Sequence, residues 1–412
     1  MQLAPIDECR VCGGTDLHTV FSLEDQYIAT IFLERAEDIE HHERYPLDLV
    51  ICGAGASGGC GFVQLRHTVP RNILFEHYWY RSGINQTMRD ALAEIVRGIG
   101  EYAEVNTGDV VCDIGCNDGT LLSFYPNRFK RIGIDPAANM AEFSRPNADV
   151  IISDYFSAAA YFSATKQKAK AITSIAMFYS VVDPVNFARG VAQILHDDGV
   201  WILQMSSLQL MIKNNCYDNI VHEHVGYYTI DVMDRLLETV GLHVVDCEIN
   251  DINAGSVRLY IKKKQLQNTP RVAALRESEM RGAYRDLTTY NRFAAESETQ
   301  TNKLREFLDS NEAQETCFYG ASTKGNVILQ HCKAGPKDTF GIAERNTKKF
   351  GYFTLGSNLP IISEEEMRLR KPANVIVLPY HFRTEIVKRE SALLEAGTRL
   401  VFPLPQFEVL TR

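Results

Sequence analysis

The stretch Val110-Val-Cys-Asp-Ile-Gly-Cys-Asn-Asp-Gly-Thr120 decides the fold of this chain. A short apolar run ends at an aspartate, passes through a glycine turn and leads into a segment of helical pattern. This order predicts the first strand, turn and helix of a nucleotide-binding sheet. One strand later, the run Lys130–Pro136 closes on Asp135, which is placed to accept hydrogen bonds from both hydroxyls of a ribose.

Two features of this turn favour S-adenosylmethionine over a nicotinamide cofactor. Its glycines depart from the G-x-G-x-x-G pattern of dinucleotide folds. Its carboxylates suit the cationic amino group and sulfonium of S-adenosylmethionine better than they suit a pyrophosphate. An acidic segment, Ser153-Asp-Tyr-Phe156, is expected to recognise the adenine. The predicted cofactor-binding residues are Asp113, Gly115, Asn117, Asp118, Gly119, Asp135, Asp154, Tyr155 and Met177.

The order of elements predicts an α/β protein built on doubly wound parallel sheets. Strand-like runs alternate with helical segments from the first strand onward, beginning after a predicted helix at about 84–102. The segment 271–311 is highly charged and helical in pattern, and a second α/β pattern follows it. We therefore expect an N-terminal zinc-binding region (1–70), a central methyltransferase-type domain (71–270), a helical connector (271–310) and a C-terminal Rossmann-like domain (311–412).

Composition and charge narrow the possible partners. The 43 basic and 52 acidic residues among 412 give a net charge of −9, which argues against sequence-independent nucleic-acid binding. No run approaches the roughly 18 apolar residues that span a bilayer, and the first residues lack a secretory pattern. Ten cysteines, mostly in apolar surroundings, favour the reducing cytoplasm over a disulfide framework. We expect a cytoplasmic protein without a membrane or nucleic-acid partner.

Four cysteines near the N-terminus predict a structural zinc site. Cys9-Arg-Val-Cys12 is followed by two glycines, as in a zinc knuckle. Cys52 and Cys60 would form the second pair, although seven residues separate them. The alternative is two free thiols and two buried ones. Four thiolates leave no open coordination position, so the metal would support the fold and take no part in chemistry.

The segment His222-Glu223-His224 carries three titratable groups in a row. It lacks the i, i+4 spacing of a helical zinc site. If the segment is extended, His222 and His224 face one side and Glu223 faces the other. An imidazole is a suitable base for removing a proton next to a carbonyl, and the alternative is a structural histidine.

Seven motifs occur in an order that resembles a known family. The chain resembles the S-adenosylmethionine-dependent sugar C-methyltransferases that act on nucleotide-linked deoxyketohexoses, over residues 9 to about 405. The motifs are CRVCGG (9–14), GGCGFVQL (58–65), YWYRSGINQTMRD (78–90), VCDIGCNDGTLL (111–122), NIVHEHVGYYT (219–229), AGSVRLYI (254–261) and CFYGASTKGN (317–326).

The resemblance implies a monomeric enzyme that methylates carbon 3 of an NDP-4-keto-6-deoxyhexose. A base removes the proton that the 4-keto group acidifies, and the enolate attacks the methyl group of the cofactor. By similarity His224 is the base, Glu223 assists it, and Tyr78 and Tyr80 contact the sugar or the enolate oxygen.

The resemblance also implies a sugar-nucleotide site in the C-terminal domain. There the turn after the first strand and Lys324 would hold a pyrophosphate. The residues that would reach the nucleotide are Glu344, Asn346, Lys348 and Lys349. The alternatives are a solvated surface pair for Lys348 and Lys349 and a structural role for Arg258. The expected substrate-binding residues are His222, Arg258, Tyr319, Ser322, Thr323, Lys324, Asn326, Asn346, Lys348 and Lys349.

The chain departs from the family at two positions near these motifs. Val221 stands where the family often has tyrosine, and Ser180 stands where some members carry histidine. Two other functions remain open. One is an O- or N-methyltransferase of another small molecule. The other is an NAD-type oxidoreductase or a non-catalytic nucleotide-binding protein, which the absence of G-x-G-x-x-G in the C-terminal turn disfavours.

Overall fold

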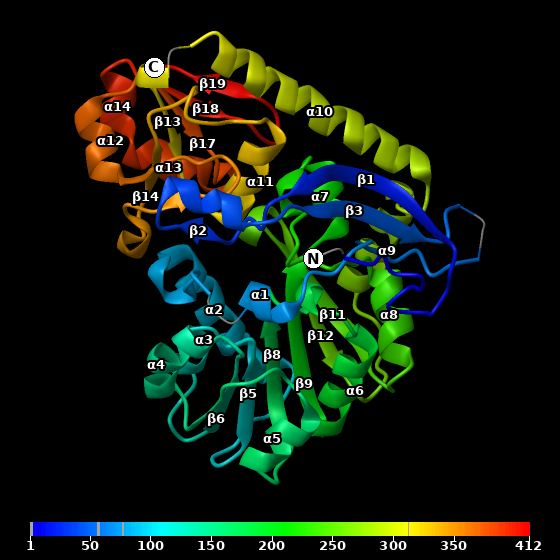
Figure 1. The fold of residues 1–412 in the computed structure, drawn as a ribbon. Coiled ribbons are helices and arrows are strands. Elements are labelled where there is room, and N and C mark those ends of the chain that lie inside the picture. The colour runs from blue at the N-terminus through cyan, green and yellow to red at the C-terminus, as the bar shows by residue number, and fades with distance from the viewer. Residues whose placement is uncertain (1–2, 56–57, 76–77, 312) are drawn as a thin grey trace.

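A computed structural model of the chain describes residues 3–55, 58–75, 78–311 and 313–412. Within them the strands form three larger sheets and one two-stranded pair. In Figure 1 the central sheet occupies the lower half, the C-terminal sheet the upper left, and the N-terminal strands lie between the two.

The central sheet contains seven strands in the order β11-β12-β9-β8-β5-β6-β7. The five strands from β9 to β7 are parallel, whereas β12 runs antiparallel to both β9 and β11, so the sheet is mixed rather than wholly parallel. Val110 to Ile114 are all buried, as expected of a strand covered on both faces. The strands are β5 (Val110–Ile114), β6 (Lys130–Ile134), β7 (Val150–Ile152), β8 (Ala169–Ile175), β9 (Leu195–Ser206), β11 (His243–Asn250) and β12 (Ser256–Lys262).

Helices cover this sheet on both faces. One of them, α2, begins at an N-cap, where the Asn85 side chain accepts a hydrogen bond from the Thr87 amide. The helices of this half are α1 (Arg71–Phe75), α2 (Gln86–Gly98), α3 (Thr120–Ser123), α4 (Ala141–Ser144), α5 (Ala158–Ala164), α6 (Pro184–Ile194), α7 (Leu208–Lys213) and α8 (Ile230–Glu238).

The N-terminal sheet is antiparallel and draws its last strand from far along the chain. Its order is β1-β3-β4-β10, with β1 (Leu17–Gln26), β3 (Tyr45–Cys52) and β4 (Val63–Leu65). The fourth strand, β10 (Gly226–Tyr227), pairs with β4 immediately after the His-Glu-His segment. This pairing anchors the segment to the N-terminal region.

The C-terminal sheet has the order β16-β14-β13-β17-β18-β19, and only β19 is antiparallel to its neighbour. Its topological switch point lies between β13 and β17, where open α/β sheets bind ligands. The elements are β13 (Thr316–Tyr319), α11 (Thr323–His331), β14 (Ile342–Glu344), β16 (Ile361–Ser363), α12 (Glu364–Arg370), β17 (Asn374–Val377), α13 (Arg383–Arg389), α14 (Ser391–Glu395), β18 (Arg399–Phe402) and β19 (Glu408–Leu410).

Two helices and a short strand pair tie the parts together. Helices α9 (Pro270–Gly282) and α10 (Leu287–Asp309) occupy the segment for which the sequence predicts helix. Helix α10 runs past β1 toward the C-terminal sheet (Figure 1), and the rings of Phe293 and Phe21 lie 5.0 Å apart. The pair β2 (Phe32–Leu33) and β15 (Phe353–Thr354) joins the N-terminal region to the C-terminal domain.

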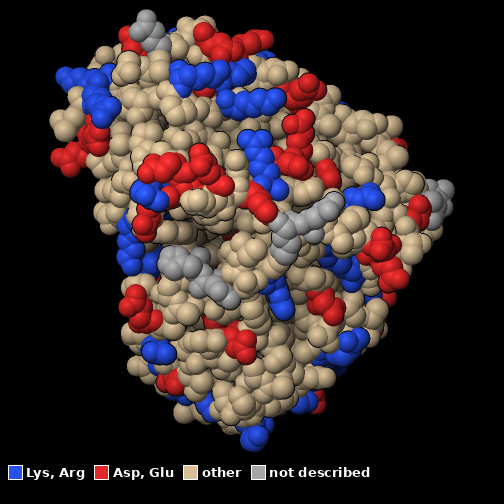
Figure 2. Space-filling model, in the orientation of Figure 1, with Lys and Arg blue, Asp and Glu red and all other residues tan. Residues whose placement is uncertain are grey.

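The buried core follows the same connections. One apolar cluster runs from the N-terminal sheet through residues 208–227 into the C-terminal sheet, while two others fill the faces of the central sheet. Among the described residues, no helix combines the length and the apolar character that crossing a bilayer requires. Figure 2 shows Lys and Arg interspersed with Asp and Glu over the visible face.

Candidate active site

One cavity of about 790 Å³ lies between the central and C-terminal sheets. Its walls are formed by the residues at the carboxyl ends of β5, β6 and β8 on one side and of β13, β14 and β17 on the other. Both sets of loops are the ligand-binding edges of their sheets. The cavity can therefore hold two ligands end to end, one from each sheet.

The β5 turn forms the cofactor end of this cavity. Gly115 has a φ of +78°, and a Cβ on it would lie 2.8 Å from Met177 Cγ, so only glycine fits. The Asp135 carboxylate accepts the amides of Asn117 at 2.8 Å and Ala137 at 2.9 Å, and each oxygen keeps capacity for a further donor.

Asp113 supplies the test of whether a cationic cofactor fits here. It is 3% exposed and accepts one side-chain hydrogen bond, from Thr173 Oγ1 at 2.6 Å. Burial raises its pKa from 3.8 to about 7. A buried carboxylate on a cavity wall is stabilised when a cationic group binds beside it. The α-amino group and sulfonium of S-adenosylmethionine meet that requirement.

Asn117 and Asp118 hold another segment over the cavity. The side-chain amide of Asn117 donates from Nδ2 to the Tyr80 carbonyl at 2.9 Å, and Asp118 Oδ2 accepts a hydrogen bond from the backbone amide of Gly83 at 2.9 Å. Asp118 and Gly119 both lie outside the cavity lining. A Cβ added at Gly119 would lie 2.9 Å from the Cα of Ser144. The structure thus indicates that Asp118 positions the 80–83 segment and that Gly119 packs against Ser144, rather than direct cofactor contact for either residue.

The predicted adenine-binding residues lie at the wall of the same cavity. Asp154, Tyr155 and Met177 all line it. The guanidinium of Arg71 covers the Tyr155 ring at 4.3 Å, which fixes that side chain at the rim.

Glu223 and His224, neighbours in the chain, both line the cavity. His224 Nδ1 lies 2.8 Å from the carbonyl oxygen of Asn219. A carbonyl only accepts, so Nδ1 carries the hydrogen and Nε2 keeps a lone pair. Burial and the charge of Lys324 lower the His224 pKa to about 3, which keeps the imidazole neutral. The imidazole is therefore neutral but only weakly basic here, and a diphosphate that neutralised the charge of Lys324 would make it a stronger base.

Three tyrosines surround this pair. Tyr78 Oη lies 3.4 Å from Glu223 Oε2, and burial raises the Glu223 pKa to about 7. The Tyr179 ring packs on the His224 ring at 3.9 Å between centroids. Tyr80 also lines the cavity and is half exposed. Phenol hydroxyls are therefore available near the imidazole to stabilise a developing oxyanion.

The local shape of the His-Glu-His segment differs from the extended conformation that we expected. Residues 222–223 form a turn, and the His224 amide donates to the Val221 carbonyl at 3.0 Å. The turn sends Glu223 and His224 to the cavity and directs His222 away from it. His222 is 3% exposed and donates from Nε2 to the Tyr45 carbonyl at 3.1 Å. It is therefore a structural contact with β3 and not a cavity residue.

The C-terminal turn forms the opposite end of the cavity. Ser322 caps α11 by accepting the Gly325 amide at 3.1 Å, and Ser322, Thr323 and Lys324 line the cavity. Lys324 Nζ donates to the Asn253 carbonyl at 2.8 Å. Among the residues after β14, the cavity lining includes Glu344, Arg345, Asn346 and Lys349. Together with the α11 N-terminus, the cations Lys324, Arg345 and Lys349 provide a setting for a diphosphate.

Lys349 is a half-buried cation rather than part of a solvated pair. Its Nζ donates to the Ala321 carbonyl at 2.7 Å and lies 4.3 Å from the Phe32 ring centroid, and burial lowers its pKa. Lys348 lies outside the cavity lining, with its Nζ 5.2 Å from the Phe143 ring centroid.

Two further residues expected to bind substrate are fixed in the domain interior instead. Tyr319 is 3% exposed; its hydroxyl donates to Glu364 at 2.5 Å, lies 3.2 Å from Glu390 Oε1 and accepts from Arg389. Asn326 is 1% exposed and donates to the Ala29 carbonyl at 2.7 Å. Neither residue lines the cavity, because both side chains point into the packed core.

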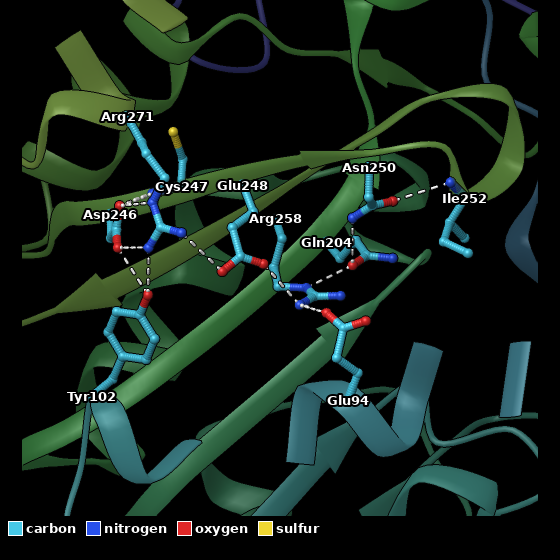
Figure 3. Close-up of polar contacts among 10 residues, drawn as sticks. All are labelled: Glu94, Tyr102, Gln204, Asp246, Cys247, Glu248, Asn250, Ile252, Arg258 and Arg271. Atoms are coloured by element: carbon cyan, nitrogen blue, oxygen red, sulfur yellow. Dashed lines mark hydrogen bonds and ion pairs between the residues drawn. The ribbon is translucent and has the colours of Figure 1, made fainter. Parts of the chain in front are cut away.

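Arg258 lines the cavity, but other side chains accept from its Nε and Nη1 (Figure 3). It is 3% exposed and donates to Gln204 at 2.8 Å and to both Glu94 and Glu248 at 3.0 Å. These contacts link α2 to β9, β12 and β11. The alternative of a structural role is thus the one that the geometry supports.

Sequence reasoning missed several cavity residues. Tyr179, Asn253, His381 and the aromatic Phe382 all line the cavity. Burial and the nearby charge of Lys324 lower the His381 pKa to about 3. None belongs to a motif with a recognisable spacing, so a sequence pattern gave no signal for them. Val221 and Ser180, the two departures from the family, also line the cavity.

The four N-terminal cysteines meet at one point. Their sulfur atoms lie within 4.8 Å of one another, with Cys9–Cys60 at 3.6 Å and Cys12–Cys52 at 3.5 Å. Tetrahedral zinc with Zn–S bonds of about 2.3 Å brings sulfurs to about 3.8 Å, so the donor set fits this ion. The wide spacing between Cys52 and Cys60 is absorbed by a loop in which the Gly61 amide donates to the Cys52 carbonyl.

Three family models match the chain in succession. They describe a zinc-binding domain (residues 9–75), a methyltransferase domain (80–246) and a C-methyltransferase C-terminal domain (251–405). Together the three models span nearly the whole chain. The chain is also similar to the C-methyltransferase NovU of Streptomyces niveus, which is 29% identical over 418 residues that cover 99% of this chain and 97% of the relative. An S-adenosylmethionine-dependent C-methyltransferase is thus an enzyme class that fits the sheets and the cavity described above.

Solved structures resemble only part of this C-methyltransferase. Magnesium protoporphyrin IX methyltransferase of Synechocystis PCC 6803, solved with bound S-adenosylmethionine, is 12% identical with a TM-score of 0.32 and covers 43% of this chain and 78% of its own. The N-methyltransferase NodS of Bradyrhizobium japonicum is 11% identical with a TM-score of 0.34, covering 44% and 98%.

Proposed function

We propose that this C-methyltransferase transfers a methyl group to carbon 3 of an NDP-4-keto-6-deoxyhexose through an enolate. The observation that carries the proposal is His224, whose held tautomer leaves Nε2 unprotonated on the wall of a two-ended cavity. A neutral imidazole suits deprotonation of a carbon next to a ketone. The cofactor-type turn and the diphosphate-type turn open onto the same space, which supports an acceptor that carries a nucleotide.

The two ends of the cavity would hold the two reactants. Asp113, Gly115 and Asp135 are the residues that fit S-adenosylmethionine, which when bound supplies an electrophilic methyl group. Lys324 and Lys349, with the α11 N-terminus, would hold the diphosphate of the sugar nucleotide. The ketose would then lie between the two ends, next to His224.

In the proposed step, the C3–H bond breaks and its proton passes to His224 Nε2. The electron pair forms the C3–C4 double bond, and the charge moves to the oxygen on carbon 4. To donate to that oxygen, Tyr78 would give up its long hydrogen bond of 3.4 Å to Glu223, and burial of Tyr78 raises its pKa so that the phenol stays protonated. The C4–oxygen double bond would then re-form as the electron pair of carbon 3 attacks the methyl group of bound S-adenosylmethionine, whose S–CH3 bond would break and leave neutral S-adenosylhomocysteine.

The test is transfer of a labelled methyl group from S-adenosylmethionine to a panel of dTDP-, GDP- and CDP-linked 4-keto-6-deoxyhexoses. We expect label on carbon 3 of at least one sugar, and we expect loss of transfer in His224→Ala. Label on an oxygen or nitrogen of the acceptor would make the enzyme an O- or N-methyltransferase and would overturn the enolate step.

A further inference from the structure

The turn that fixes the His224 tautomer is held by the C-terminal domain. The short 3₁₀ helix η7 (Tyr217–Asn219) supplies the Asn219 carbonyl, which lies 2.8 Å from His224 Nδ1. One residue earlier, the fully buried Asp218 accepts a hydrogen bond from Tyr380 Oη at 2.8 Å. Tyr380 follows β17, so a continuous chain of contacts runs from the C-terminal sheet to the imidazole.

Other contacts hold η7 from the same side. The Tyr217 ring packs against His331 of α11 at 5.2 Å, and Thr301 of α10 donates to Tyr217 Oη at 3.1 Å. A second donor, Tyr227 Oη, lies 3.3 Å from the Asn219 carbonyl. The position of that carbonyl therefore depends on elements that lie 70 or more residues further along the chain.

Burying the Asp218 carboxylate costs free energy of folding unless hydrogen bonds or opposite charges compensate it. Burial raises the Asp218 pKa, while the charge of Lys324 and the Tyr380 hydroxyl both lower it. An apolar side chain of similar size would pack here without that cost. Both stabilising groups come from the C-terminal domain, and Lys324 also lines the cavity end expected to bind the diphosphate.

We infer that Tyr380 and Asp218 are positioning residues for proton abstraction. Their hydrogen bond fixes η7, and η7 in turn holds the Asn219 carbonyl that keeps Nδ1–H on His224 and leaves Nε2 free. The C-terminal domain thus orients the base as well as binding the sugar nucleotide. This inference rests on the proposed role of His224.

The test uses exchange of the carbon 3 hydrogen with solvent deuterium, in the presence of the substrate and S-adenosylhomocysteine. Tyr380→Phe keeps the ring and removes the hydroxyl. We expect the exchange rate constant to fall about 10- to 100-fold, as for a misplacement of about 1 Å, with KM for the sugar nucleotide and Kd for S-adenosylhomocysteine within about twofold. The matched control is Tyr290→Phe, which removes a buried hydroxyl that donates to the Tyr284 carbonyl at 2.7 Å in α10. It should exchange at the wild-type rate.

A double-mutant cycle separates coupling from general destabilisation. If Asp218 and Tyr380 act through one contact, Asp218→Ala also lowers the exchange rate constant. The Asp218→Ala, Tyr380→Phe double variant should then exchange no more slowly than the more impaired of the two single variants. Wild-type exchange in Tyr380→Phe, or losses that multiply in the double variant, would overturn the inference. The His224→Ala variant distinguishes a failure of the proposed function from a failure of the positioning inference. Retained exchange there removes the proposed function itself, whereas loss there with normal exchange in Tyr380→Phe removes only this inference.

Discussion

Replacing Asp113 by asparagine tests the cofactor end of the cavity through its pH dependence. The carboxyl is 3% exposed, and burial raises its pKa from 3.8 to about 7. Asparagine keeps the shape and still accepts the Thr173 hydroxyl, but it does not titrate. The two proteins should therefore differ only where the aspartate changes its charge.

The sign of the stability effect follows from proton binding. Because the folded protein holds a proton on Asp113 that the unfolded chain loses at lower pH, the wild type loses stability as pH rises from about 4 to about 7. A shift of about three units corresponds to roughly 4 kcal/mol. Without cofactor, the unfolding free energy of Asp113→Asn, relative to that of the wild type, should rise by up to this amount between pH 4 and pH 8. Glu223 and Glu279, whose pKa values are also raised by burial, are present in both proteins and cancel in the difference.

Cofactor binding, unlike folding, should favour the ionised form of Asp113 and therefore higher pH. A cationic cofactor selects the ionised carboxylate, so the wild type should bind S-adenosylhomocysteine about tenfold more weakly at pH 6 than at pH 8. Asp113→Asn should bind it weakly and with no such slope. Calorimetric titration at both pH values measures the affinities, and urea unfolding of the apo proteins measures stability. Parallel pH profiles for the two proteins, in binding and in unfolding, would refute the assigned role of Asp113.

Four further predictions follow from the same geometry. Gly115→Ala should weaken S-adenosylhomocysteine binding about tenfold in calorimetry, because φ is +78° and the new Cβ meets Met177. Elemental analysis should find one zinc per chain, which Cys12→Ser loses together with thermal stability in a melting scan. Lys324→Met should raise KM for the sugar nucleotide about 100-fold in the methyl-transfer assay and leave cofactor affinity unchanged. Arg258→Met should lower the urea-unfolding free energy by about 1–2 kcal/mol, because Gln204 and Glu248 each lose a donor but keep Asn250 and Arg271, while kcat stays near normal.

The local parts of the fold could be predicted from the sequence. A buried apolar run, a glycine of positive φ and a following aspartate are properties of adjacent residues, so the β5 turn and Asp135 were accessible without a structure. The zinc-type pair Cys9 and Cys12 is likewise a local signal. The antiparallel β12 was not predicted, because strand direction within a sheet depends on which distant strand it pairs with.

The parts that depend on distant contacts could not be predicted. The sequence does not state that β10 pairs with β4, and that pairing follows the turn that separates His222 from His224. Asp118 resembles a cofactor ligand by position, but its partner is an amide 35 residues earlier. In the same way, only the folded chain brings Tyr380 to the turn beside the imidazole.

Hydrogen exchange at carbon 3 tests the central claim most directly, because it isolates proton abstraction from methyl transfer. Proton NMR in D₂O can follow the sugar nucleotide with S-adenosylhomocysteine bound and either the wild type or His224→Gln. We expect the wild type to lose the carbon 3 signal and His224→Gln to slow that loss at least ~100-fold, with both ligands still bound. Equal rates in the two proteins would contradict the assignment of His224 as the base.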